Sequence, residues 1–169
     1  MEENVALTRG YNMAFGVMSK RLFEIMQPDV FEALLKNALP KGKESDDAET
    51  RKFAVKSLSQ ALRTWGLHNV PTEILRECLE TFYRCLNDYQ VDRRGDVGSW
   101  VREAAMVALK DFIYSLFNPP AESLKTAYAE IRTLLGVDSP AFFERFVCSM
   151  IQQLCEKIDK VREVAGRNL

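Results

Sequence analysis

The chain has 169 residues, of which 47% are hydrophobic and 28% charged, and its net charge at pH 7 is −1. This balance suits one globular domain or a piece of an elongated one, and it excludes the strong attraction to nucleic acid or anionic lipid that basic proteins show. The sequence has no apolar run of about 18 residues that would predict a membrane span. Its acidic start also lacks the pattern of a signal peptide, so we expect a cytoplasmic protein.

Every periodic segment has the three-to-four spacing of apolar residues that is typical of an amphipathic helix, and none alternates for long enough to predict a strand. Glycine, proline and charged loops separate the segments, and Pro28 is expected to stop or bend the second helix. Seven or eight helices are predicted, covering approximately residues 4–20, 22–38, 46–65, 71–89, 96–118, 121–135, 142–158 and the remaining C-terminal residues.

The apolar residues of these helices predict the core. The inward-facing side chains are expected to include those of Leu75, Leu79, Phe82, Leu86, Tyr89, Val101, Ala105, Ala108, Phe112, Leu116, Phe142, Phe143 and Phe146. At the helix starts, residues 46–49 resemble a capping box, and Ser139-Pro140 has a capping residue followed by proline at the first helical position.

One pattern recurs in the helices, an arginine followed by an alanine at the third position and a leucine at the seventh. Its copies are Arg51-x-x-Ala54-x-x-x-Leu58, Arg102-x-x-Ala105-x-x-x-Leu109 and Arg162-x-x-Ala165-x-x-x-Leu169, with a weaker copy at Thr8, Tyr11 and Phe15. The small alanine allows paired helices to approach closely. The repetition predicts an all-α fold, a HEAT/armadillo-like α-solenoid of antiparallel helix pairs.

The repeats also predict the domain organisation. Residues 1–169 are expected to form a single fragment of a longer solenoid with three to four repeats and an extra helix near residues 121–135. The chain begins on what resembles the second helix of a pair and ends within a helix, so we expect ends without capping repeats.

The four cysteines do not predict a disulfide or a chelating pair within a helix. Cys78 and Cys85, like Cys148 and Cys155, are seven residues apart, which corresponds to about 10 Å along a helix. Two interpretations stay open: two pairs of small buried thiols, or a zinc site that uses all four cysteines.

No catalytic group of residues is apparent, and no metal site or cofactor is predicted. The single histidine, His68, is expected to be a turn residue, and the chain has no glycine-rich phosphate-binding motif of the P-loop type. The chain is therefore expected not to be an enzyme.

The best candidate for a functional site is the charged loop between the fourth and fifth helices. Two glycines keep it from being helical throughout, and Asp96 or Ser99 is expected to cap the following helix. One interpretation is that the loop contacts an acidic partner, with candidate residues Asp92, Arg93, Arg94 and Asp96. The other is a tight inter-helix turn fixed by Gly95, Gly98, Trp100 and Arg102, in which Arg102 pairs with a carboxylate.

The amino-acid sequence of this loop and of the helix after it resembles the C-terminal region of the tubulin-folding cofactor D family. The resemblance runs from Asn87-Asp88-Tyr89 through Arg93-Arg94-Gly95-Asp96-Val97-Gly98-Ser99-Trp100-Val101-Arg102 to Met106. Shorter matches lie at Thr8-Arg9-Gly10-Tyr11 and at residues 152–162. The family has serine in place of Arg93 and threonine in place of Ser99, so the loop of this chain is more basic.

The resemblance implies a non-enzymatic HEAT-repeat chaperone that binds β-tubulin and, with other tubulin-folding cofactors, assembles and dissociates the αβ-tubulin heterodimer. It also implies an ADP-ribosylation-factor-like small GTPase as a partner, stimulation of GTP hydrolysis by tubulin, and association with the cytoskeleton. Two other classes stay open on the residues alone: a HEAT-type adaptor unrelated to tubulin, and a metal-dependent or thiol enzyme that uses the cysteines.

Overall fold

The computed structural model describes residues 4–42 and 47–169, and this part of the chain is almost entirely helical. Its eight α-helices are α1 (Val5–Gly16), α2 (Lys20–Ala38), α3 (Ala48–Trp65), α4 (Thr72–Cys85), α5 (Gly98–Phe117), α6 (Lys125–Leu135), α7 (Pro140–Leu154) and α8 (Asp159–Asn168). Two 3₁₀ turns, η1 (Leu67–Asn69) and η2 (Glu122–Leu124), precede α4 and α6, and two short strands, β1 (Val91–Asp92) and β2 (Gly95–Asp96), lie between α4 and α5.

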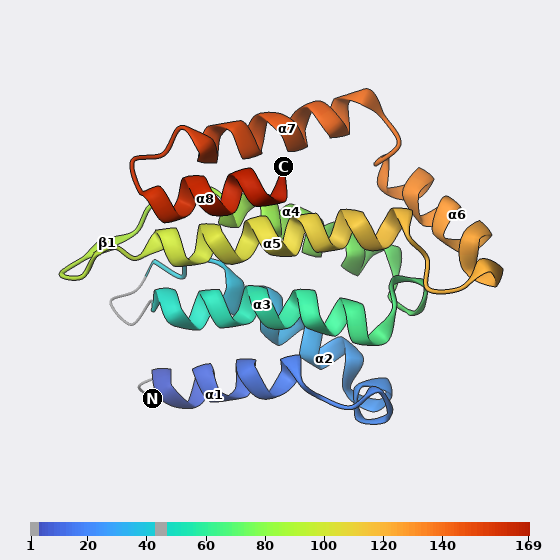
Figure 1. Cartoon of the computed structure of the whole chain (residues 1–169). Coiled ribbons are helices and arrows are strands. Elements are labelled where there is room, and N and C mark those ends of the chain that lie inside the picture. Colours follow the sequence, from blue (N-terminus) through green and yellow to red (C-terminus); the bar gives the residue numbers. More distant parts are fainter. Residues whose placement is uncertain (1–3, 43–46) are drawn as a thin grey trace.

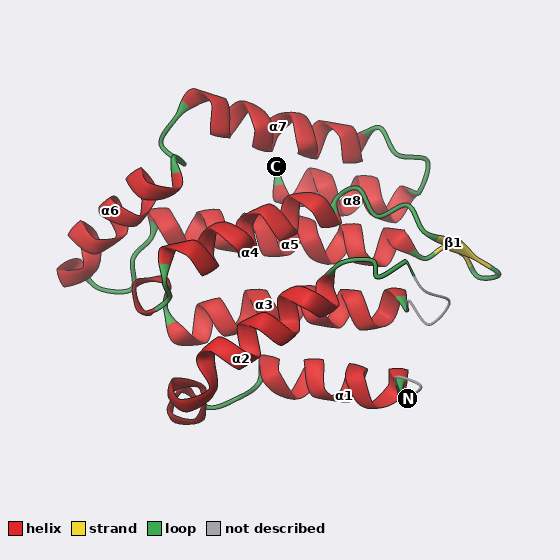
Figure 2. Cartoon of the chain, turned by 180° about the vertical axis from the view of Figure 1, so that it is seen from behind, coloured by secondary structure: helices red, strands yellow, loops and turns green. Residues whose placement is uncertain are grey.

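The helices form two layers (Figure 1). In the first layer α1, α3, α5 and α8 lie side by side and run in the same direction, each in contact with the next. Behind this row, α2 packs on α3, α4 on α5, and α7 on α8 (Figure 2). Helices α4 and α7 run in the opposite direction to the row, and α6 lies at one end of the molecule. The expected all-α solenoid fold is confirmed.

The recurring alanine lies where the row helices pack. Ala54, Ala105 and Ala165 are all fully buried, as a close approach between neighbouring helices requires. Leu58 and Leu109 are also fully buried, whereas Leu169 of the last copy is 54% exposed.

The recurring arginines are buried in two of the three copies. Arg51 and Arg102 have 1% and 0% of their surface exposed, whereas Arg162 is exposed at the start of α8. The weaker copy predicted in α1 is wrong by one position, because the residue that takes the place of the arginine is Arg9, not Thr8. Arg9 forms an ion pair with Asp47, which precedes α3, at 2.9 Å. The pattern is obscured in the sequence because Asn12 and Gly16 stand where alanine and leucine are expected, and both are buried.

Several helix boundaries differ from the sequence predictions. Helix α1 ends at Gly16 instead of near residue 20. Helix α2 continues through Pro28, and its first turns point in a different direction from the rest (Figure 1), which agrees with the predicted bend. Helices α4 and α7 end at Cys85 and Leu154, about one turn earlier than expected. The predicted helix over residues 121–135 is divided into η2 and α6.

Several side chains that the sequence predicts to be buried are exposed in the structure. Tyr89 lies beyond α4 and is 45% exposed, so its predicted place in the core is wrong. Phe142 is buried, but Phe143 is 41% exposed, and Cys148 and Cys155 on α7 are exposed. The prediction of two buried thiol pairs therefore holds only for α4.

Asp47 caps α3 and joins it to α1. Its carboxylate accepts hydrogen bonds from the backbone N–H and the hydroxyl of Thr50, each at 2.9 Å, in addition to the ion pair with Arg9. Position 46, the first of the predicted capping box, lies outside the described residues.

The cap makes stability depend on pH. Burial acts to raise the pKa of Asp47, but the hydrogen bonds from Thr50 and the charge of Arg9 outweigh burial, and the pKa is lowered. Because the folded pKa lies below the unfolded one, the stabilising effect is present above about pH 4 and is lost as the pH falls through the folded pKa. We expect Asp47→Ala to lower the free energy of unfolding by about 1 kcal/mol at pH 7 and by less in acid. Urea unfolding at both pH values measures this, and an equal loss at both would contradict it.

Candidate functional site

The segment between α4 and α5 forms a small antiparallel hairpin, which the sequence did not predict. Val91 pairs with Asp96 and Asp92 with Gly95. Gly95 has a φ of 101°, a conformation that side-chain-bearing residues rarely adopt. The residue directly before α5 is Val97, but Asp96 accepts a hydrogen bond from the backbone N–H of Ser99 in the first turn of α5 at 3.0 Å, which is the contact that the predicted cap would make.

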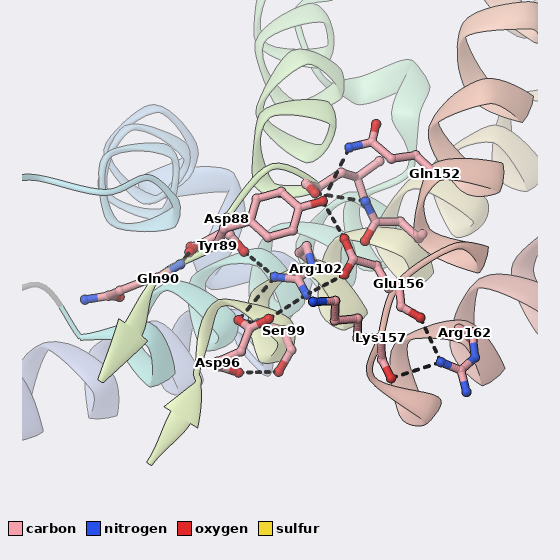
Figure 3. Close-up of polar contacts among 12 residues, drawn as sticks. Asp88, Tyr89, Gln90, Asp96, Ser99, Arg102, Gln152, Glu156, Lys157 and Arg162 are labelled. Atoms are coloured by element: carbon pink, nitrogen blue, oxygen red, sulfur yellow. Dashed lines mark hydrogen bonds and ion pairs between the residues drawn. The ribbon is translucent and has the colours of Figure 1, made fainter. Parts of the chain in front are cut away.

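Two buried arginines of neighbouring row helices hold the base of this hairpin. From α3, the Arg51 Nε donates to the Asp88 carboxylate at 2.8 Å, and both side chains are almost fully buried. From α5, the Arg102 guanidinium donates to the backbone carbonyl of Asp88 at 2.6 Å and to the Asp96 carboxylate at 2.9 Å (Figure 3). The predicted carboxylate partner of Arg102 is therefore Asp96.

A second group of contacts joins the hairpin base to the turn between α7 and α8 (Figure 3). The Arg102 guanidinium lies over the Tyr89 ring, 4.3 Å from its centroid. The Tyr89 hydroxyl donates to the Glu156 carboxylate at 2.6 Å and accepts from the Gln152 amide at 3.3 Å. The exposed tyrosine thus connects two segments that are 67 residues apart in the sequence.

The two candidate arginines at the hairpin tip have different surroundings. The Arg94 guanidinium donates to the Asp92 carboxylate at 2.6 Å and lies 5.0 Å from the centroid of the Trp100 ring. The hydrogen bonds from Arg94 lower the pKa of Asp92. Arg93 is exposed and forms no ion pair with any residue that the structure describes, so it is the side chain most available to a partner.

The structure brings all the predicted loop residues into one region but gives them different surroundings. Gly95, Gly98 and Arg102 lie at the turn and base of the hairpin, and Trp100 is half-buried beside it. Sequence reasoning missed Arg51, Asp88 and Glu156 as members of the same network. Arg51 and Arg102 occupy the same position of the recurring arginine-alanine-leucine pattern, and this shared position could have indicated that both lie at the base of the hairpin.

Cys78 and Cys85 are buried in α4, and His68 lies in the turn before that helix. Burial raises the pKa of Cys85 to about 12 and raises that of Cys78 as well, so both thiols stay protonated at neutral pH. His68 lies in η1, where its ring approaches that of Tyr128. Within residues 4–42 and 47–169, no group of three or more metal-ligating side chains is arranged to hold a metal ion.

The comparisons with known proteins converge on one family. Residues 144–169 match the family described as tubulin folding cofactor D C terminal. Tubulin-specific chaperone D of Dictyostelium discoideum is 37% identical over 81 residues, which are 47% of this chain and 6% of that protein. These matches relate the chain to the C-terminal region of tubulin-folding cofactor D. The resemblance found in the sequence is thereby confirmed.

The match to tubulin-folding cofactor D includes part of the polar network. Residues 144–169 contain Gln152 and Glu156, which bind Tyr89, and all of α8. The aligned region spans only a small part of the length of the Dictyostelium relative. No solved structure matches the chain. None of the helices in the described residues is both long and apolar enough to cross a membrane.

Proposed function

We propose that the chain is a scaffold segment of a tubulin-folding cofactor, which helps to bind β-tubulin and to assemble or dissociate the αβ-tubulin heterodimer. Its partners in this proposal are the other tubulin-folding cofactors and an ADP-ribosylation-factor-like small GTPase, and it works in the cytoplasm at the cytoskeleton. The observation that carries the proposal is the 37% identity to Tubulin-specific chaperone D. The layered all-α fold supports a binding role, because solenoids present long surfaces to their partners.

In this proposal the fold is a HEAT-type array of three to four repeats. The pairs are α2 with α3, α4 with α5, and α7 with α8, which are the cross-layer contacts of the fold. Helix α1 is the second helix of a further pair, and α6 is an insertion. The chain performs no chemistry of its own, and any stimulation of GTP hydrolysis by tubulin requires the partner cofactors.

A binding experiment with purified components tests this function. The immobilised 169-residue chain is incubated with soluble αβ-tubulin and, separately, with an ADP-ribosylation-factor-like GTPase loaded with GDP or GTP. We expect retention of tubulin or of the GTPase. If the folded chain retains neither, the tubulin-related proposal fails for this segment, and the general adaptor interpretation takes its place.

The hairpin tip is the predicted contact with an acidic partner surface. We expect Arg93→Glu/Arg94→Glu to weaken binding of tubulin by about 2 kcal/mol, roughly 30-fold, because two exposed attractions become repulsions. Arg93→Glu alone should give about half of that free-energy change without disturbing the Arg94–Asp92 contact. Titration of labelled tubulin measures the affinities. Unchanged affinity in both variants, with unchanged circular dichroism, would show that the hairpin has only a structural role.

A further inference from the structure

A groove runs between α3 and α5 in the first layer of the fold. It has a volume of about 450 Å³, and no residue of α2, α4 or α7 lines it. Trp100 lies along it, and Val164 of α8 contributes to its side. The groove is separate from the hairpin tip, although Arg94 and Lys52 both approach the Trp100 ring.

The α3 wall of the groove carries positive charge along one helix face. Lys52, Lys56, Gln60 and Arg63 follow one another at intervals of four, four and three residues, so they point in similar directions over about 16 Å. This wall carries no carboxylate. Lys56 is exposed and forms no ion pair within the described part of the chain, and the Arg63 side chain is 57% exposed.

The α5 wall carries two carboxylates, those of Glu103 and Asp111. The Asp111 carboxylate forms an ion pair with Lys110 at 2.5 Å and a longer one with Arg63 at 3.6 Å. Burial raises the pKa of Glu103, and the charges of Lys52 and Lys56 across the groove act in the opposite direction. The lining of the groove has three cations, Lys52, Lys56 and Arg63, and two carboxylates, Glu103 and Asp111, so its net charge is positive, although the chain as a whole has a net charge of −1.

The floor of the groove is apolar and made of small side chains. Ala104 and Ala108 are buried, and Val107 beside them is 41% exposed. Small side chains leave room for the apolar side chains of another segment, and a cationic wall beside an apolar floor fits an amphipathic helix with acidic residues along one edge.

We propose that this groove docks an acidic amphipathic helix of a partner protein. The helix lies along α3, with carboxylates at the spacing of Lys52, Lys56 and Arg63 and with apolar side chains over Ala104 and Val107. The inference does not rest on tubulin as the partner, because it names the chemistry of the docked segment only.

The test uses a fluorescein-labelled peptide of about twelve residues, acetylated and amidated so that its ends add no charge. Its glutamates are placed at the spacing of the three cations, among alanine and leucine. Fluorescence anisotropy measures its binding to the full chain. We expect saturable binding that Lys56→Glu/Arg63→Glu weakens about tenfold or more, because both attractions become repulsions.

The matched control is Lys36→Glu/Arg84→Glu, which makes the same charge change at exposed positions of the other layer, on α2 and α4. Its affinity should stay within about twofold of the unmodified chain, and a peptide of the same composition with its glutamates spread around the helix should bind more weakly. Val107→Glu, which places a negative charge on the floor, should also weaken binding.

Three results would overturn the proposal. Equal weakening by both double variants would mean that the peptide responds to overall charge. Unchanged affinity in Lys56→Glu/Arg63→Glu with normal circular dichroism would place the peptide elsewhere. Self-association in sedimentation velocity that this variant abolishes would identify a second copy of the chain as the occupant of the groove. Failure of peptide binding leaves the tubulin pull-down unaffected, so the two proposals can fail separately.

Discussion

Replacing Arg51 by methionine is expected to lower the free energy of unfolding by about 3 to 5 kcal/mol. The change keeps most of the length of the side chain but removes the cation that pairs with Asp88. Since the Asp88 side chain is only 3% exposed, its carboxylate would be left buried without its positive partner. Urea unfolding followed by far-UV circular dichroism measures the loss.

Two further variants separate the lost ion pair from a general effect of the substitution. Arg63→Met makes the same change at a 57% exposed position of the same helix and should cost less than about 1 kcal/mol. Adding Asp88→Asn to Arg51→Met should recover part of the stability, because no buried charge then lacks a partner. If Arg51→Met costs no more than Arg63→Met, the pair does not anchor the hairpin.

Gly98→Ala is expected to cost about 3 kcal/mol, because the position has no room for a side chain. A Cβ atom there would lie 2.3 Å from the backbone oxygen of Asp88. The backbone would have to move, and the hydrogen bond from the Gly98 N–H to the carbonyl of Gln90, at 2.9 Å, would be strained or lost. Thermal and urea unfolding measure the effect.

Gly10→Ala provides the matched control, since Gly10 lies within α1 and no atom approaches its Cβ position within 4 Å. Alanine should stabilise the helix there by about 0.5 to 1 kcal/mol. If Gly98→Ala lowers the free energy of unfolding and Gly10→Ala raises it, the close approach of the hairpin base requires glycine at position 98. A neutral Gly98→Ala would mean that this segment shifts freely.

The sequence predicted the helices well where their own residues set the limits. Gly66 and Gly136 end α3 and α6 at positions of positive φ, and Asp47 and Ser139 begin α3 and α7 as caps. The predicted ends of α4 and α7 lie about one turn too far along the chain, because the apolar spacing continues beyond Cys85 and Leu154 although the helices end there. Periodicity alone does not locate such ends.

The candidate site shows the same division between local and long-range causes. The conformational freedom of the glycines and the capping side chain of Asp96 predicted a loop followed by a helix, because these effects act within a few residues. The pairing of Arg51 with Asp88 spans 37 residues, and that of Tyr89 with Glu156 spans 67. Only packing of the row helices brings these groups together.

By itself, the sequence determined the all-α class, the recurring alanine at the helix contacts and the family resemblance, because these depend on spacing along one chain. The tertiary structure alone decided which arginines are buried, that Tyr89 is outside the core, and that α3 and α5 enclose a cationic groove. The physical reason is that burial and ion pairing depend on which faces of distant helices meet, and helical periodicity defines a face without defining its neighbour.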